Sequence, residues 1–291
     1  MLFFLLSFSV FFFFFFFFDP AGFGCEFCWI LDVTMQASPY ESIVTSPPFK
    51  FIVGATKTDF FLHAALVASQ SRALDRMING PFAEGQQGHV VLAEEDTRTV
   101  AAFAEFLYKG DYHFPSDMAP PDSVPKTMSK RAKANASHQE EWSRPGNEHW
   151  SKFTQNPAYG YDKSSATPVL NAGSLDADYS EFFIAHAKVF VFADCYGVEG
   201  LAELAMQKLH AALCGFRLSR ERLDDVLALV RFCYERPGPD KLRRLVASYT
   251  AGIVDSASPA DCFRGVLQER GDFAADVAWF LACRLVRSAE C

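Results

Sequence analysis

The chain has 291 residues, half of them hydrophobic, and a formal net charge of −8. This length suffices for one large domain or two modest ones, and the hydrophobic content excludes global disorder. The acidic balance argues against non-specific binding to nucleic acid. Phenylalanine is abnormally frequent, with 31 residues, and nearly half of them lie within the first 30 positions.

The leader, residues 1–45, begins with 18 uncharged residues that end in eight consecutive Phe. Three interpretations stay open: a wrong gene start that translates untranslated or intronic sequence, a membrane anchor of minimal length, or a cleaved signal peptide. No Lys or Arg precedes Lys50, so neither a basic signal-peptide flank nor a positive-inside bias exists at this end. We expect regular structure to begin after Pro47-Pro48.

Residues 46–114 alternate between the patterns of strands and helices. Asp96 is a good N-cap, and Gly80-Pro81 and Gly110 are stop signals. The predicted elements are two strands that form a hairpin, a helix, a third strand and a second helix: Phe49–Val53, Asp59–Leu62, His63–Asn79, His89–Leu92 and Asp96–Gly110.

Residues 115–180 differ in composition, with many Pro, Ser, Asn and Lys and few aliphatic residues. Such a segment cannot bury a packed face, so we expect a disordered insertion or linker. Its aromatic residues are out of character. They could dock onto the domain, but we expect them to be mobile: Trp142, Trp150, Tyr159 and Tyr161.

From Glu181 the chain is almost entirely helical in pattern. Apolar stripes at helical spacing predict a series of helices, centred on Phe183–Tyr196, Leu201–Leu213, Leu223–Val230, Leu242–Ile253 and Phe273–Leu281.

Short motifs stand in a fixed order in residues 46–114 and 181–215. They are a stretch from His63 through Leu66 to Ser69, the strand His89–Leu92, an F-x-x-F-L-Y-x-G ending with Tyr108 and Gly110, and an A-D-x-Y helix with Ala193, Asp194 and Tyr196. In this combination the chain resembles a BTB/POZ domain, in particular the divergent BTB proteins of filamentous fungi.

The resemblance implies an α+β fold. A BTB/POZ-like small β-sheet, capped by helical hairpins, would occupy 46–114 and close with 181–215. An all-α extension would follow over 216–291. The motif residues would be structural. One departure concerns dimerisation: the family's usual Asp in the first strand is replaced by Pro48-Phe49-Lys50.

The resemblance also implies a non-catalytic protein-interaction module. Many relatives form homodimers, and many bind a cullin scaffold as substrate adaptors of ubiquitin ligases. A hydrophobic-x-Glu motif contributes to that contact, and Phe82-Ala83-Glu84 fits it. Phe82 would enter a partner pocket, and Glu84 would steer the encounter. Alternatively, Phe82 packs into its own core beside a solvated Glu84.

The sequence contains none of the common phosphate-binding, hydrolase or zinc-protease motifs. The eight Cys include one CxxC pair, Cys25 and Cys28, which supplies only two of the four ligands of a zinc site. We interpret the cysteines, Cys195 included, as reduced and packed. We interpret His186 and His210 as surface or edge residues. No catalytic, cofactor-binding or metal-ligating residue is therefore expected.

The partners expected are proteins: a cullin scaffold, and a second copy of the chain as a homodimer. Nucleic acid and membranes are not expected. Two alternatives stay open, namely a self-assembling scaffold or nuclear regulatory partner without a ligase role, and a structural protein tethered to a membrane through residues 1–18. We expect a cytoplasmic or nuclear location, with membrane attachment only if residues 1–18 are genuine.

Overall fold

The computed structural model describes residues 39–114, 146–159, 179–216, 218, 222–235, 238–257 and 260–288. By its contacts the chain divides into residues 1–38 and residues 39–291, so all described residues belong to the second unit. The Phe-rich segment and the CxxC pair lie outside the described residues. The described part is a mixed α+β structure with twelve α-helices and a three-stranded sheet.

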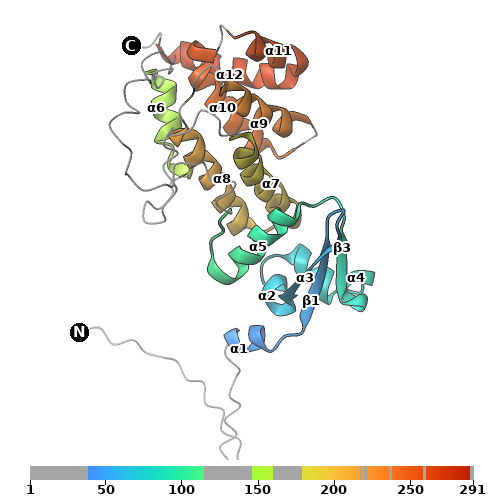
Figure 1. The fold of residues 1–291 in the computed structure, drawn as a ribbon. Coiled ribbons are helices and arrows are strands. Elements are labelled where there is room, and N and C mark those ends of the chain that lie inside the picture. Colours follow the sequence, from blue (N-terminus) through green and yellow to red (C-terminus); the bar gives the residue numbers. More distant parts are fainter. Residues whose placement is uncertain are drawn as a thin grey trace, which may run out of the picture. The chain divides into compact units, whose positions relative to one another are not determined.

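The sheet consists of β1 (Pro48–Val53), β2 (Thr58–His63) and β3 (His89–Leu92), in the order β2-β1-β3 (Figure 1). The predicted hairpin and third strand are confirmed. β1 pairs antiparallel with β2 and parallel with β3. Burial alternates along β1 because successive side chains point to opposite faces, so Phe51 and Val53 lie in the core.

Regular structure begins before the prolines, which corrects our expectation. Helix α1 (Pro39–Val44) precedes β1. Its end is held locally, because the Thr45 hydroxyl and backbone N–H both donate to the Glu41 carbonyl oxygen.

The single helix predicted over His63–Asn79 is two helices, α2 (Ala64–Ala68) and α3 (Arg72–Asn79). The helix is interrupted before Ser71. The Ser71 backbone is extended, and its side chain caps α3 by accepting a hydrogen bond from the Leu74 backbone N–H. A further short helix, α4 (Ala83–Gln87), lies between α3 and β3. Helical spacing of apolar residues continued across the break, so periodicity alone could not reveal it.

Helix α5 (Thr97–Lys109) is confirmed with the predicted cap, since the Asp96 carboxylate accepts a hydrogen bond from the Arg98 backbone N–H at 2.9 Å. The other Asp96 oxygen accepts a hydrogen bond from the Lys188 ammonium group at 2.7 Å. Burial by itself would raise the pKa of Asp96, but the bonds from Lys188 and Arg98 outweigh it and lower the pKa. The cap therefore also joins α5 to the next long helix.

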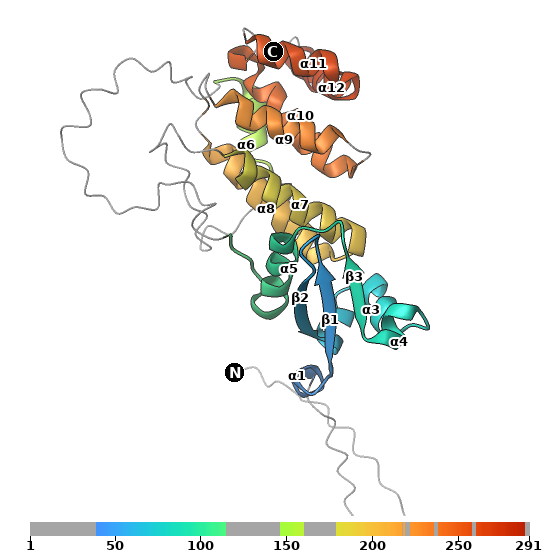
Figure 2. The same cartoon turned by 45° about the vertical axis from the view of Figure 1, so that its right-hand side comes forward.

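The predicted C-terminal helices are also confirmed. Figure 2 shows the long pair, α7 and α8, between the sheet and the last four helices. One hydrophobic core runs from Phe49 in the sheet to Val277 in the last helix. The helices are α7 (Ser180–Tyr196), α8 (Glu199–Gly215), α9 (Leu223–Glu235), α10 (Asp240–Ala257), α11 (Asp261–Glu269) and α12 (Gly271–Ser288).

The expectation of a linker throughout 115–180 is wrong at residues 146–159. These residues form α6 (Glu148–Thr154) and the 3₁₀ helix η3 (Pro157–Tyr159). Trp150 is buried and Tyr159 is half-buried against the core, so neither is a mobile aromatic. The other two aromatic residues of that expectation, Trp142 and Tyr161, lie outside the described residues.

Candidate protein-interaction surface

The Phe82-Ala83-Glu84 segment lies at the start of α4, just before β3. Phe82 stands at the N-cap position in extended conformation, and 56% of it is exposed. Glu84 lies in the first turn of α4 and is half-buried. The interpretation in which Phe82 packs into its own core is therefore wrong. An exposed aromatic ring next to a carboxylate could be covered by a partner, because aromatic anchors carry much of the energy of protein interfaces.

Close backbone contact holds α4 against α3. Gly85 faces the carbonyl oxygens of Ile78 and Gly80, and a Cβ atom at position 85 would lie only 2.8 Å from each. The Gln86 side-chain amide also donates to the Pro81 carbonyl oxygen at 3.2 Å. These contacts keep α4, which begins just after Phe82, close to the end of α3.

The motif residues of the first half come together in pairs. His63, at the end of β2, is hydrogen-bonded through Nδ1 to the Tyr108 hydroxyl at 2.9 Å, which links the sheet to the last turn of α5. The Ser69 hydroxyl donates to the Leu66 carbonyl oxygen at 2.7 Å within one turn of α2. Gly110 ends α5 with φ of 72°, a left-handed conformation that favours glycine.

The A-D-x-Y residues lie in the last turns of α7. Ala193 is fully buried and Asp194 is exposed. The Tyr196 ring packs on Phe192 with centroids 4.6 Å apart. Burial, followed by the nearby carboxylate of Glu95, raises the pKa of the Tyr196 hydroxyl to about 12, so it stays neutral. The carbonyl oxygen of Tyr196 accepts a hydrogen bond from Ser71 at 2.6 Å, which no sequence pattern indicated.

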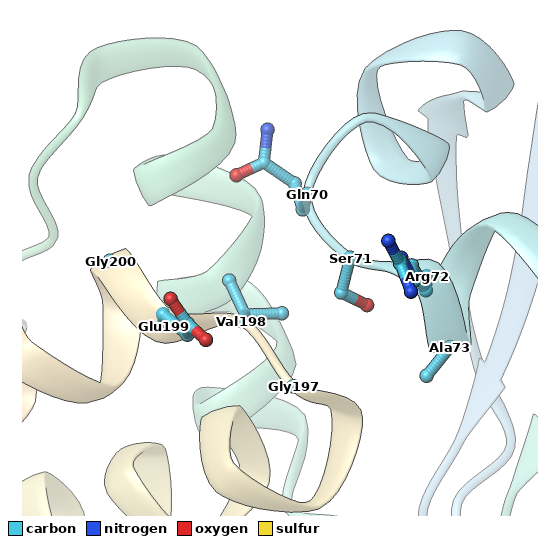
Figure 3. A pocket seen from close by; sticks show the side chains of 8 residues that line it. All are labelled: Gln70, Ser71, Arg72, Ala73, Gly197, Val198, Glu199 and Gly200. Carbon is cyan, nitrogen blue, oxygen red and sulfur yellow. The ribbon is translucent and has the colours of Figure 1, made fainter.

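A pocket of about 420 Å³ lies beside this contact (Figure 3). It is lined by residues 70–73, between α2 and the start of α3, and by residues 197–200, between α7 and the start of α8. Arg72 and Glu199 give its two sides opposite charge. None of its lining residues belongs to the segment around Phe82, so the two features are separate.

The interpretation of His186 and His210 as surface or edge residues is wrong, because both are buried. His186 is hydrogen-bonded through Nδ1 to the Tyr112 hydroxyl at 2.7 Å. Burial, followed by the positive charge of Lys208, lowers the pKa of His186 to about 3. Lys208 in turn donates to the Tyr112 carbonyl oxygen and to the Asp111 carboxylate, both at 2.6 Å. This cluster joins the chain after α5 to α7 and α8, and its hydrogen bonds give it a structural role.

Cys195 is exposed rather than packed as predicted. Burial of part of the side chain, followed by the charges of Glu95 and Asp194, raises the pKa of the Cys195 thiol. A raised pKa reduces the thiolate fraction, so this cysteine is poorly suited to act as a nucleophile.

Within the described residues, no group of three or more His, Cys, Asp or Glu side chains is arranged to hold a metal ion. In the same part of the chain, no helix combines the length and apolar character needed to cross a bilayer.

A scan of the sequence against protein-family models finds no match, and a search of the curated proteins finds none either. The BTB/POZ resemblance therefore rests on the motifs of this chain.

Proposed function

We propose that this chain is a non-catalytic protein-interaction module of the BTB/POZ type that acts as a substrate adaptor of a cullin-based ubiquitin ligase. The observation that carries the proposal is the exposure of Phe82, 56% of which faces solvent, two residues before Glu84 at the start of α4. An aromatic ring offers a large apolar area to a partner and has only two χ angles to order on binding, which favours a role as an interface anchor.

The order of elements supports the BTB/POZ part of the proposal. A hairpin is followed by short helices, then by a third strand parallel to β1 and by α5. The pair α7–α8 follows later in the chain and packs on α5 through α7. This order agrees with the small sheet capped by helical hairpins that the resemblance implies. The pairs His63–Tyr108 and Ser71–Tyr196 give several motif residues a structural role in that arrangement.

The adaptor role is tested by measuring the affinity of the full chain for the purified cullin that binds BTB adaptors. Phe82→Ala should weaken binding by at least about 30-fold, the loss of an aromatic hot spot. Glu84→Ala should mainly slow association and reduce its dependence on salt.

The matched control is Phe61→Ala. Phe61 is an equally exposed aromatic residue, 62% exposed, but it lies on β2. The Phe61→Ala variant should bind the cullin as tightly as wild type does. A folded wild-type chain that does not bind, or an equal loss for Phe61→Ala and Phe82→Ala, would contradict the adaptor role.

Self-assembly is a second candidate, favoured by the exposed apolar side chains of α1. Tyr40 is 73% exposed and Val44 also faces solvent. Pairing of α1 between two copies would cover both side chains. Analytical ultracentrifugation should then show a dimer that dissociates in Tyr40→Glu. A chain that stays monomeric at about 100 μM would exclude a dimer with a Kd of about 1 μM.

A further inference from the structure

Helix α6 and the following η3 pack onto a surface made by helices much later in the chain. α6 packs against α10 (Figure 1). The short η3 packs against α8. Residues 115–145 before the segment and residues 160–178 after it lie outside the described residues. We call residues 147–159 the docked segment, and His210, Ser248, Tyr249 and Gly252 its receptor surface.

Two aromatic anchors attach the docked segment. Trp150 and Phe153 are only 8% and 4% exposed. The Tyr249 ring of α10 lies 5.8 Å from the Trp150 ring and 5.7 Å from the Phe153 ring, centroid to centroid. The opposite face of α6 is exposed and carries Ser151 and Lys152. Trp150 and Phe153 stand at positions i and i+3, a spacing with which amphipathic helices bind to protein surfaces.

The receptor surface also fits the docked segment in shape. Gly252 lies directly under the Trp150 ring, and a Cβ atom there would lie 3.1 Å from Trp150 Cε3. The absent side chain leaves the space that the indole ring fills. A branched residue such as Val at position 252 would extend further toward the ring and displace it.

Hydrogen bonds to main-chain carbonyls set the register of the segment. The Asn147 amide donates to the Gly252 carbonyl oxygen, and His149 Nε2 donates to that of Ser248, both at 2.8 Å. In the other direction, His210 Nε2 donates to the carbonyl oxygen of Phe153 at 2.8 Å. The His210 ring also stacks on Tyr159, with centroids 4.7 Å apart. The segment also carries its own helix cap, since the Asn147 side chain accepts a hydrogen bond from the Trp150 backbone N–H at 2.8 Å. The anchors, the cap and most of the register contacts are thus supplied by residues 147–159 themselves.

We propose that the receptor surface is a helix-binding site that the docked segment occupies as a replaceable ligand, and that the same segment of a second copy of this chain can take its place. The His149 ring also meets the Phe280 ring of α12, with centroids 5.9 Å apart. All these contacts join the segment to residues of α8, α10 and α12, so an identical segment from another molecule can make the same contacts. Exchange of identical elements is a low-cost route to association. This site shares no residue with the Phe82 surface and does not depend on the proposed function.

The test uses a fluorescent peptide of residues 146–160 and the full chain with Trp150→Ala and Phe153→Ala, the anchor variant. The anchor variant keeps its receptor surface but lacks a competent resident segment, so it should bind the peptide saturably. Wild type should bind at least about 10-fold more weakly, because its own segment competes at a high effective concentration. Circular dichroism checks that the variant is folded.

Matched changes on both sides identify the site. A peptide with Trp150→Ala and Phe153→Ala should bind at least about 100-fold more weakly, whereas Ser151→Ala on the exposed face should change nothing. Adding Gly252→Val to the anchor variant should abolish peptide binding. A folded anchor variant that does not bind the peptide at millimolar concentration would overturn the proposal.

A second route covers an anchor variant that fails to fold. Protease sites introduced within 115–145 and 160–178 allow the segment to be cut free in the otherwise wild-type chain. The labelled peptide should then replace it while the helical signal persists. If the remaining protein unfolds when the segment leaves, the segment is an integral part of the core and the proposal is wrong.

Exchange between copies is tested by mixing the anchor variant with a Gly252→Val chain, which carries an intact segment. The two should form a complex that excess peptide dissociates. If they form no complex, or only one that the peptide does not displace, the segment does not exchange between copies.

Discussion

The hydroxyl of Ser71 donates a hydrogen bond of 2.6 Å to the carbonyl oxygen of Tyr196, which lies 125 residues further along the chain. The same oxygen of Ser71 accepts the Leu74 backbone N–H at 3.1 Å and so caps α3. One side chain thus caps the start of α3 and connects the turn between α2 and α3 to the C-terminal end of α7.

Replacing Ser71 by Ala should destabilise the protein by about 1–2 kcal/mol, since the cap of α3 and the contact with α7 are lost together. Urea unfolding measures the change. Ser69→Ala is the matched control, because the Ser69 hydroxyl bonds to its near neighbours Leu66 and Gln70 and to no distant residue in the described part of the chain. Its effect should stay below about 0.5 kcal/mol. Equal effects of the two substitutions would contradict this prediction, because neither the cap of α3 nor the contact with Tyr196 would then contribute measurably.

Gly85→Ala should destabilise the protein by about 1–3 kcal/mol, as overpacking does. The new Cβ atom would meet two backbone carbonyl oxygens at 2.8 Å, and backbone cannot turn aside as a side chain can. Gly265→Ala provides the contrast, because Gly265 lies in α11 with open space around it. That change should stabilise by about 0.5–1 kcal/mol through helix propensity. In thermal unfolding, the midpoint should therefore fall for Gly85→Ala and rise for Gly265→Ala.

Stability should fall as the pH is lowered from about 6.5, because His186 is held neutral by burial and by Lys208, with its pKa lowered to about 3. Between these values the unfolded chain takes up a proton that the folded chain does not, so the free energy of unfolding decreases toward acid. The full effect is on the order of 5 kcal/mol. Burial lowers the pKa of His210 as well, which adds in the same direction.

The double variant His186→Phe with Tyr112→Phe isolates the contribution of His186. It removes both partners of one buried hydrogen bond, so neither is left unsatisfied and stability at pH 7 should stay close to wild type. Urea unfolding at pH 7, 5.5 and 4.5 should show a shallower loss toward acid in this variant. A pH dependence identical to wild type would mean that His186 does not titrate in this window.

Lys208→Met should destabilise the protein by about 2–3 kcal/mol. The ammonium group bonds the Asp111 carboxylate and the Tyr112 carbonyl oxygen, and its removal leaves both without that donor. The figure is below that for a fully buried pair, because the Asp111 side chain is still partly exposed. Adding Asp111→Asn should restore part of the lost free energy of unfolding, as measured by urea unfolding. If the double variant is as unstable as the single one, the lost charge on Asp111 is not the cause.

Local patterns were sufficient for much of the fold. The strands Phe49–Val53 and His89–Leu92 follow from short β-prone runs between turn signals, and the cap at Asp96 from a favoured residue type before an apolar stripe. The C-terminal helices follow from apolar spacing for the same reason: periodicity and capping depend on residues within a few positions of each other. The segment Phe82-Ala83-Glu84 was also visible as a short motif, but its exposure was not.

The sequence by itself determined where most helices and strands form, because their signals are local. The tertiary structure decided which side chains are buried and which segments dock. The cap residue Asn147 precedes an amphipathic helix that buries Trp150 and Phe153. The polar composition of the surrounding sequence nevertheless predicted no packed face. Their partner Tyr249 is about 100 positions away. His210 is buried because it meets the carbonyl oxygen of Phe153, 57 positions earlier. Burial depends on such distant partners, and no local pattern names them.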